Sequence, residues 1–288
     1  MKTREQLVIV DTVQTAGAVS YFRCSTDTDL TTLATAWAKA GLDAQLLPKP
    51  PKDEVALGRA VNAQAEKRRL VRPLERRGAW AIVEETVQPG ATPTYRTLVK
   101  VTSVNGSPQV LLADGTPAEW AQIDTAVRGS YAHHRNMLAH SDVSAWLIDL
   151  AYANNAVSLR ESGGVYFIPR PAVDFWMKVA GAVDASGSSV FTIPAMRTAE
   201  AVAAITDAIT AEATAMAQTV EDELMKTGDE ALGKRALNTR VETAMELLKK
   251  LSTYEELIGQ QLAIRSRVET LSANVTAAAL TAQMTEAA

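Results

Sequence analysis

Cysteine is almost absent from this chain, since Cys24 is the only one among 288 residues. A lone cysteine cannot form an intramolecular disulfide, which excludes a small disulfide-stapled scaffold. No window approaches the roughly 20 apolar residues that cross a bilayer. The first apolar run, residues 7–10, is too short for a signal-peptide core. We therefore expect a cytoplasmic protein with no membrane partner.

Common catalytic fingerprints are also missing. The sequence has no GxxxxGKS, GxxxxGKT or GxGxxG loop for phosphates, no GxSxG for a serine nucleophile, and no HExxH or CxxC for a metal. These absences argue against the commonest nucleotide, serine-hydrolase and zinc sites, and nothing predicts a cofactor. An unfamiliar enzyme stays open.

Charge and aromatic side chains are distributed unevenly along the chain. Residues 1–197 hold 21 Lys and Arg against 19 Asp and Glu, with 14 of the 15 aromatic residues. Residues 198–288 hold 8 against 14, and their only aromatic residue is Tyr254. The formal net charge of −4 therefore combines +2 with −6. A basic surface in the first region is compatible with an acidic chain.

Residues 1–115 are predicted to form an α+β unit. Strands are expected at residues 7–13 and 18–23, and amphipathic helices at residues 30–41 and 53–69. Between residues 70 and 112, apolar runs alternate with turn signals, and Asn105-Gly106 is a strong hairpin signal. We expect an antiparallel meander of three or four strands, with the two preceding helices on one face.

Residues 116–197 are predicted to form a helix–hairpin–helix unit. A helix should begin at Thr116 and reach the His133 region, and another should begin at Ser141 or Asp142. The segment SLRESGGVYFIP, Ser158–Pro169, then predicts a hairpin. Helix followed by hairpin is the order of a winged-helix unit and also of generic α+β construction. Val165–Pro169 is echoed at Val190–Pro194, which predicts one more strand, whether by duplication or by coincidence.

The same segment, SLRESGGVYFIP, resembles an uncharacterised family of prokaryotic and phage proteins, a domain of unknown function. The likeness covers about residues 140–200, including the alanine-rich helix that follows the motif. The resemblance implies a microbial or phage protein of the cytoplasm. It implies no activity, cofactor or catalytic residue.

Residues 198–288 are predicted to form a long, coiled-coil-like α-helical hairpin. Apolar residues recur at spacings of three and four, first from Ile205 to Leu224 and again from Leu237 to Val275. The two arms would span about 28 and 50 residues, which leaves an apolar overhang on the second. The overhang either packs back on the rest of the chain or pairs with another chain, and we expect a homo-oligomer.

A basic segment is the first candidate for a ligand surface. Residues 67–77 hold six cations and one acid. Phosphate neutralisation needs such a cluster, and nearby aromatic rings can stack on bases. The predicted nucleic-acid-binding residues are Lys67, Arg68, Arg69, Arg72, Arg76, Arg77, Trp80 and Tyr95. The alternative is a solvated edge strand, whose charges discourage aggregation and pair with Glu66, Glu84 and Glu85.

All three histidines lie within His133–His140. On a continuous helix His133 and His140 share a face, and Asp142 is near enough to complete the ligation of a divalent metal. Ser141-Asp142 also resembles a helix cap, which would break that alignment. We favour the other interpretation, in which the histidines lie at a partly exposed helix end near the negative pole of its dipole.

The sequence as a whole favours a non-enzymatic interaction protein. It would self-associate through residues 198–288 and present a basic surface to a ligand such as DNA or RNA. One alternative is a metal-dependent hydrolase or nuclease that uses His133, His140 and Asp142. Another is a virion or assembly component.

Overall fold

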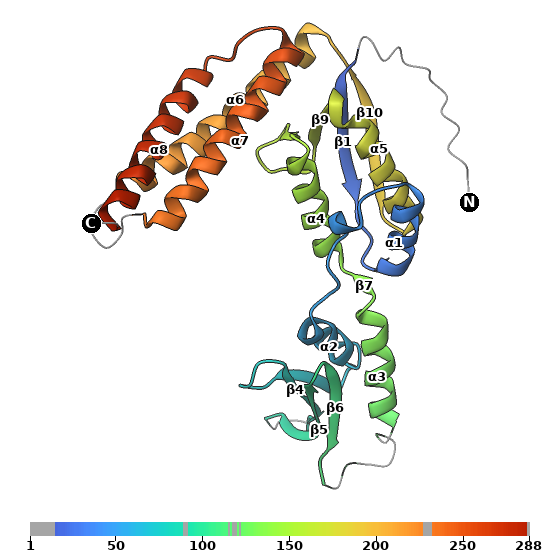
Figure 1. Ribbon diagram of the computed structural model, residues 1–288. Helices are drawn as coiled ribbons and strands as arrows, with labels where there is room; N and C mark the ends of the chain where they lie inside the picture. Colours follow the sequence, from blue (N-terminus) through green and yellow to red (C-terminus); the bar gives the residue numbers. More distant parts are fainter. Residues whose placement is uncertain are drawn as a thin grey trace. The chain divides into compact units, whose positions relative to one another are not determined.

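The computed structural model describes residues 15–88, 92–114, 116, 120, 122–226 and 232–286. Within them the chain is α+β with antiparallel sheets, as the sequence predicts. It folds into two compact units (Figure 1). Unit 1 takes residues up to Phe22, Leu147–Ala180 and Val190–Ala288, and unit 2 takes Arg23–Trp146 and Gly181–Ser189. The predicted strand at residues 7–13 lies outside the described residues.

The two units do not coincide with the three predicted parts. The boundary at residue 115 falls within unit 2, and the boundary at residue 197 falls within unit 1. Whether the three predicted parts are separate domains stays a prediction.

Unit 1 contains a sheet in the order β10-β1-β9-β8. Its strands are β1 (Thr15–Arg23), β8 (Val157–Ser158), β9 (Tyr166–Pro169) and β10 (Ser189–Met196). β1 runs antiparallel to β9, with Gly17 opposite Pro169. A side chain at Gly17 would collide with the carbonyl oxygen of Ile168, so the close approach of these strands requires glycine there. The two echoed segments are therefore β9 and β10, on either side of β1.

In the hairpin Ser158–Pro169 the returning strand is buried, whereas the turn is exposed at residues 160–162 and 164. β9 is an inner strand, and Tyr166, Phe167 and Ile168 are at most 2% exposed. The strand of the predicted wing is thus part of the core while its turn is open to solvent, and the winged-helix interpretation stays a prediction. Helices α4 (His140–Ala153) and α5 (Arg170–Ala185) flank it in the chain. From α5, the buried Trp176 indole donates to the hydroxyl of Ser20 on β1 at 2.8 Å.

The C-terminal region forms three helices, α6 (Ala199–Leu224), α7 (Lys234–Ile258) and α8 (Arg265–Glu286). The predicted second arm is divided because Gly259 adopts a left-handed φ of 83° and ends α7. Arg265 then pairs with Glu255 across the turn at 2.7 Å. α8 folds back on α7 and buries Leu271 and Val275 within the chain. The predicted apolar overhang thus packs against helices of the same chain.

These helices share one core with the β1 sheet. Ala16, Val157 and Phe167 lie in the same buried cluster as Ile209 and Leu251. Burying this apolar surface is the main force that holds unit 1 together.

A buried lysine links α7 to the turn before β8 by a hydrogen bond. Lys250 is 7% exposed, and its ammonium donates to the carbonyl oxygen of Ala156 at 2.7 Å and to Glu212 on α6 at 2.5 Å. The Tyr254 hydroxyl, one turn further along α7, donates to the carbonyl oxygen of Asn155 at 2.8 Å. Burial lowers the pKa of Lys250, and Glu212 opposes that effect. The carboxylate thus helps this lysine to stay charged inside the fold.

Unit 2 begins with a two-strand ladder and a helix. β2 (Thr28–Asp29) pairs with β7 (Met137–Leu138), and Asp29 caps α1 (Leu30–Lys39) by accepting from the Thr32 amide. The short helix η2 (Ala44–Leu46) follows. The buried indole of Trp37 donates to the Asp43 carbonyl oxygen, which fixes the chain after α1.

The rest of unit 2 is built on a meander sheet in the order β3-β4-β5-β6. Its elements are α2 (Asp53–Asn62), β3 (Arg69–Pro73), β4 (Ala79–Thr86), β5 (Thr94–Val104), β6 (Ser107–Leu112) and α3 (Ile123–His134). The predicted Asn105-Gly106 hairpin joins β5 to β6, with φ values of 50° and 73°. α2 is shorter than predicted. The residues predicted to start α3, 117–119, lie outside the described residues.

The helices on the meander sheet are α2 and α3, not the two helices that precede it. Leu57 on α2 and Val127 on α3 share a buried cluster with Ile82 and Val99 of the sheet. Trp37 of α1 instead donates a hydrogen bond to Asp43 in the turn that follows this helix. Its ring centroid lies 5.5 Å from that of Trp146 on α4. The helix after the sheet thus takes the place predicted for α1.

Replacing Glu212→Ala should lower the free energy of unfolding by about 2–4 kcal/mol, because the Lys250 ammonium would then be buried without its carboxylate. Urea denaturation of the full chain measures this loss. Adding Lys250→Met to the same chain removes the uncompensated charge and should recover part of it. Glu246→Ala, at an exposed position of α7, is the matched control, expected within about 0.5 kcal/mol of wild type. An unchanged urea midpoint for Glu212→Ala would contradict this role for the pair.

Candidate nucleic-acid interface

The strand register sorts the meander side chains between two faces. On one face, Trp80 and Ile82 of β4 lie beside Val71, Val99 and Val101 and pack in the cluster with α2 and α3. The alternate residues point the other way, and we call that side the open face. Its exposed side chains are Arg68, Arg72, Tyr95, Thr97, Lys100, Gln109 and Leu111. Beneath them, β4 contributes the buried residues Ala79, Ala81 and Val83.

A β-bulge decides what β5 contributes to the open face. Ile82 pairs with Val99 and Val83 pairs with Thr97, so Leu98 is an extra residue in β5. Under strict alternation Tyr95 and Lys100, five positions apart, would lie on opposite faces. The extra residue brings both to the open face.

Lys100 is a basic residue that sequence reasoning missed. Its side chain is exposed, and it lies opposite Ala81 of β4. Arg72, on β3 at the other side of β4, lies opposite the same alanine. The only available signal was the strand periodicity, and this assigns Lys100 to the wrong face unless the bulge is known.

Ion pairs divide the predicted basic residues into two groups. Arg69 pairs with Glu66 at 3.3 Å and lies over the Trp120 ring, 4.2 Å from its centroid. Arg77 pairs with Glu54 at 2.9 Å. The second group is exposed and has no ion-pair partner among the described residues: Lys67, Arg68, Arg72 and Arg76. This second group can meet a phosphate without breaking an internal pair.

The two predicted aromatic residues lie in different environments. Trp80 faces α2, and a Cβ at Gly58 would fall 2.9 Å from its ring. It therefore belongs to the core, and stacking on a base does not fit its position. Tyr95 is 53% exposed on the open face, with the Arg72 guanidinium 5.9 Å from its ring centroid.

The Tyr95 hydroxyl donates to Glu85 at 2.9 Å. Glu85, through this hydrogen bond, raises the pKa of Tyr95, so the phenol stays protonated and uncharged at neutral pH. Of the acids predicted to neutralise the basic segment, Glu66 does pair with Arg69. Glu84 instead pairs with Arg96, at 3.6 Å. The internal compensation is thus only partial.

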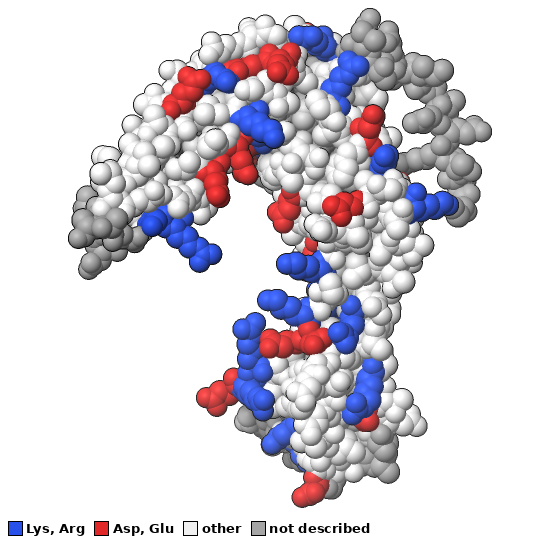
Figure 2. All heavy atoms as spheres, in the orientation of Figure 1, with Lys and Arg blue, Asp and Glu red and all other residues white. Residues whose placement is uncertain are grey.

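Basic side chains gather on unit 2. Residues 66–100 hold eight Lys and Arg against four Asp and Glu, a net charge of +4 in a chain whose total is −4. In Figure 2, blue atoms crowd the region where Figure 1 labels α2, β4 and β5, and red atoms are frequent over the C-terminal helices. A polyanion would therefore find its favourable potential on unit 2.

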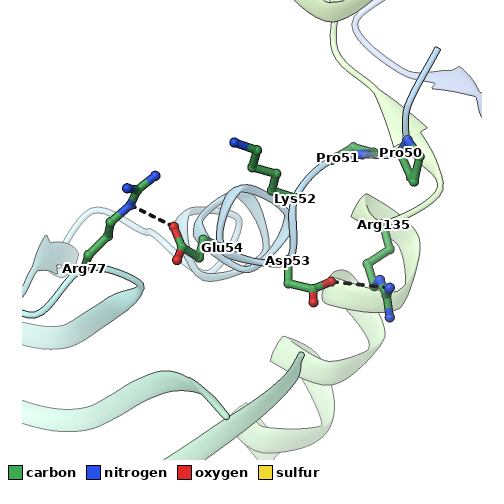
Figure 3. A pocket seen from close by; sticks show the side chains of 7 residues that line it. All are labelled: Pro50, Pro51, Lys52, Asp53, Glu54, Arg77 and Arg135. Atoms are coloured by element: carbon green, nitrogen blue, oxygen red, sulfur yellow. Dashed lines mark ion pairs between the residues drawn. The ribbon is translucent and has the colours of Figure 1, made fainter. Parts of the chain in front are cut away.

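A hollow of about 560 Å³ lies at the start of α2 (Figure 3). Its charged side chains are Lys52, Asp53, Glu54, Arg77 and Arg135. Arg77 pairs with Glu54, and Arg135 pairs with Asp53 at 3.3 Å. Since both guanidinium groups are compensated there, the hollow offers an anion little beyond Lys52.

The histidine cluster is not assembled as a metal site in the part of the chain that the structure describes. No group of three or more His, Cys, Asp or Glu side chains is placed there to hold a metal ion. His133 lies in the last turn of α3 and His140 begins α4, with β7 between them. Asp142 caps α4 by accepting from the Ala139 amide and pairs with Arg59 at 2.8 Å. Metal binding by His133, His140 and Asp142 stays a prediction, which metal analysis of the untagged protein would check.

Cys24 is half-buried, and burial raises the pKa of its thiol. Since the thiolate is the reactive form, this position does not favour a nucleophile. Among the described residues, no helix is both long enough and apolar enough to cross a membrane.

Comparison with known proteins found one family. The model of a family of unknown function, DUF6744, matches residues 17–286. This agrees with the resemblance to an uncharacterised family and extends it to nearly the whole chain. No curated protein and no solved structure matches the chain.

The histidine region should make stability fall at mildly acidic pH. Burial, with smaller contributions from His133 and Arg59, lowers the pKa of His134. The unfolded chain takes up a proton near pH 6.5, whereas the folded chain resists it, so stability is full above that pH and falls below it. His134→Gln should therefore flatten the decline in Tm between pH 7 and pH 5. Equal slopes for variant and wild type would contradict this.

Proposed function

The chain belongs to the DUF6744 family, whose function is unknown, and we propose that it is a non-enzymatic interaction protein that binds nucleic acid through unit 2. One observation carries the proposal. Five exposed cations of the meander region have no ion-pair partner among the described residues: Lys67, Arg68, Arg72, Arg76 and Lys100.

Unpaired cations are what a polyanion binder requires. Each lysine or arginine that meets a phosphate releases condensed counterions, and this release drives binding that is independent of sequence. A cation already held by a carboxylate must first break that pair. Arg69 and Arg77 are held in this way, so they belong to the fold of unit 2 more than to its ligand surface.

The alternative interpretation, charges that protect a sheet edge, explains only part of the set. β3 is an edge strand of the meander sheet, and charges on an edge discourage pairing with other chains. Lys100, however, lies on β5, an inner strand. Edge protection gives no reason for an unpaired cation there.

Binding to nucleic acid should weaken steeply with salt. With about four phosphate contacts, affinity should fall roughly 50-fold for single strands and roughly 150-fold for duplexes between 50 and 200 mM salt. Replacing Lys67, Arg68, Arg72 and Arg76 together by Ala should remove most of this dependence. Fluorescence anisotropy with labelled single-stranded and duplex DNA and RNA measures it.

A charge-matched control separates local binding from net charge. Lys39, Arg170, Lys178 and Lys249 are exposed and lie outside the meander sheet, and changing all four to Ala removes the same charge. This variant should retain nearly wild-type affinity. If no nucleic acid binds at 50 mM salt, or if both variants lose affinity equally, the proposal fails.

Self-association through residues 198–288 is a second proposal. It no longer rests on the apolar overhang that the sequence predicts. The predicted overhang is buried within the chain, so these helices need no second copy to complete their core. What supports contact with another copy is a set of apolar residues on α7, on α8 and at the C-cap of α6, which are 55–82% exposed: Met225, Met245, Leu280 and Met284.

Light scattering after size exclusion should show an oligomer of the full chain that dissociates when Met245, Leu280 and Met284 are changed to Gln. Very large particles in the same run would instead support an assembly component. A monomer at all concentrations would remove the self-association proposal.

A further inference from the structure

We propose that the open face of the meander sheet binds single-stranded nucleic acid, with Tyr95 stacking on a base and Arg72 and Lys100 contacting phosphates. This inference rests on the proposed function, and it adds the form of nucleic acid and the face that binds it. The observations that carry it are the exposure of all three side chains and their shared face.

The two cations flank a small residue. Arg72 on β3 and Lys100 on β5 both lie opposite Ala81 on β4. Since neighbouring strands are about 4.8 Å apart, their Cα atoms are separated by roughly 10 Å across the sheet. A sugar–phosphate backbone that follows β4 would have a cation on each side.

Tyr95 lies further along the same face, opposite Glu85. Glu85 is four positions from Ala81 along β4, so the Cα of Tyr95 is roughly 13 Å along the sheet from the Cα row of Arg72 and Lys100, while the long Arg72 side chain brings its guanidinium to 5.9 Å from the Tyr95 ring centroid. This places an aromatic ring and the pair of cations within reach of successive nucleotides of one strand. Half of the tyrosine surface is open to solvent, at 53% exposure.

The chemistry of the face favours a single strand over a duplex. An exposed ring on a sheet stacks on the flat faces of unpaired bases, which neighbouring base pairs cover in a duplex. Thr97 and Gln109, also exposed on this face, can exchange hydrogen bonds with the edges of splayed bases. Major-groove recognition normally inserts a helix or a β-ribbon, and here the helices α2 and α3 pack on the opposite face.

One acid opposes this binding. Glu85 lies on the open face, where its carboxylate accepts the hydrogen bond of Tyr95. Arg68, Arg72 and Lys100 outnumber it, so the face keeps a net positive charge. A strand that passes over Tyr95 would come close to Glu85, and neutralising that carboxylate should increase affinity.

The test uses the full chain and 20-nucleotide probes, one single-stranded DNA, one single-stranded RNA and one blunt duplex DNA, in fluorescence anisotropy at 100 mM salt. We expect the single strands to bind more tightly than the duplex. Tyr95→Leu should weaken single-strand binding about 10-fold, whereas Tyr95→Phe keeps the ring and should stay within about 2-fold of wild type. Glu85→Gln should strengthen binding.

Charge variants complete the test. Arg72→Ala with Lys100→Ala should weaken single-strand binding and reduce its salt slope by about 1.4, for two lost phosphate contacts. Arg128→Ala, on α3 and outside the open face, is the control and should leave affinity unchanged. Circular dichroism confirms that each variant is folded.

The outcomes distinguish the two proposals. If nucleic acid binds but the duplex binds as tightly as the single strands, the open-face inference is wrong and the proposed function stands. The same holds if Tyr95→Leu keeps wild-type affinity. If none of the probes binds even at 50 mM salt, the proposed function itself is overturned.

Discussion

The meander sheet depends on one extra residue. Leu98 and Val99 are consecutive in β5, and both lie in the cluster beneath α2 and α3. A regular strand cannot bury two neighbouring side chains on one face, so the bulge is the condition for packing both. The same residue fixes the positions of Tyr95 and Lys100, since the side chains before it change faces relative to those after it. The hydrophobic core of unit 2 and the composition of its open face thus have one common cause.

Much of the fold could be predicted from local patterns. The hairpin at Asn105-Gly106, the strands of the meander and the helices around Trp37 and Trp176 follow from turn chemistry and periodicity. The break after α7 could not be predicted in this way, because the apolar spacing continues from Ile258 to Leu262 across Gly259 and the pattern looks unbroken. A left-handed glycine is needed to end a helix there, but a glycine alone does not reveal that conformation.

The candidate site could be predicted only in part, for a different reason. Clustering in sequence identified the basic segment, but it could not show which cations are paired. Arg77 meets Glu54, which lies 23 positions earlier in the chain, and Arg59 meets Asp142 from another element. Such pairs depend on tertiary packing. They remove Arg77 from the unpaired set and give Asp142 a cationic partner, and neither effect has a local signal.

The shared core of unit 1 has a consequence for the order in which the chain can fold. Ala16 on β1 and Val268 on α8 belong to the same buried cluster, although more than 250 positions separate them. During synthesis, the residues of the meander sheet and its two helices are complete long before α8 exists, so unit 2 can form while unit 1 still lacks part of its core. Contacts this distant in sequence also close slowly, because the chain must lose loop entropy before they form. Until α6 and α7 are made, the buried Phe167 of β9 lacks Ile209 and Leu251, which share its cluster, and α8 then adds Val268. The cover of β1 and β9 is thus completed in steps as the C-terminal helices are made.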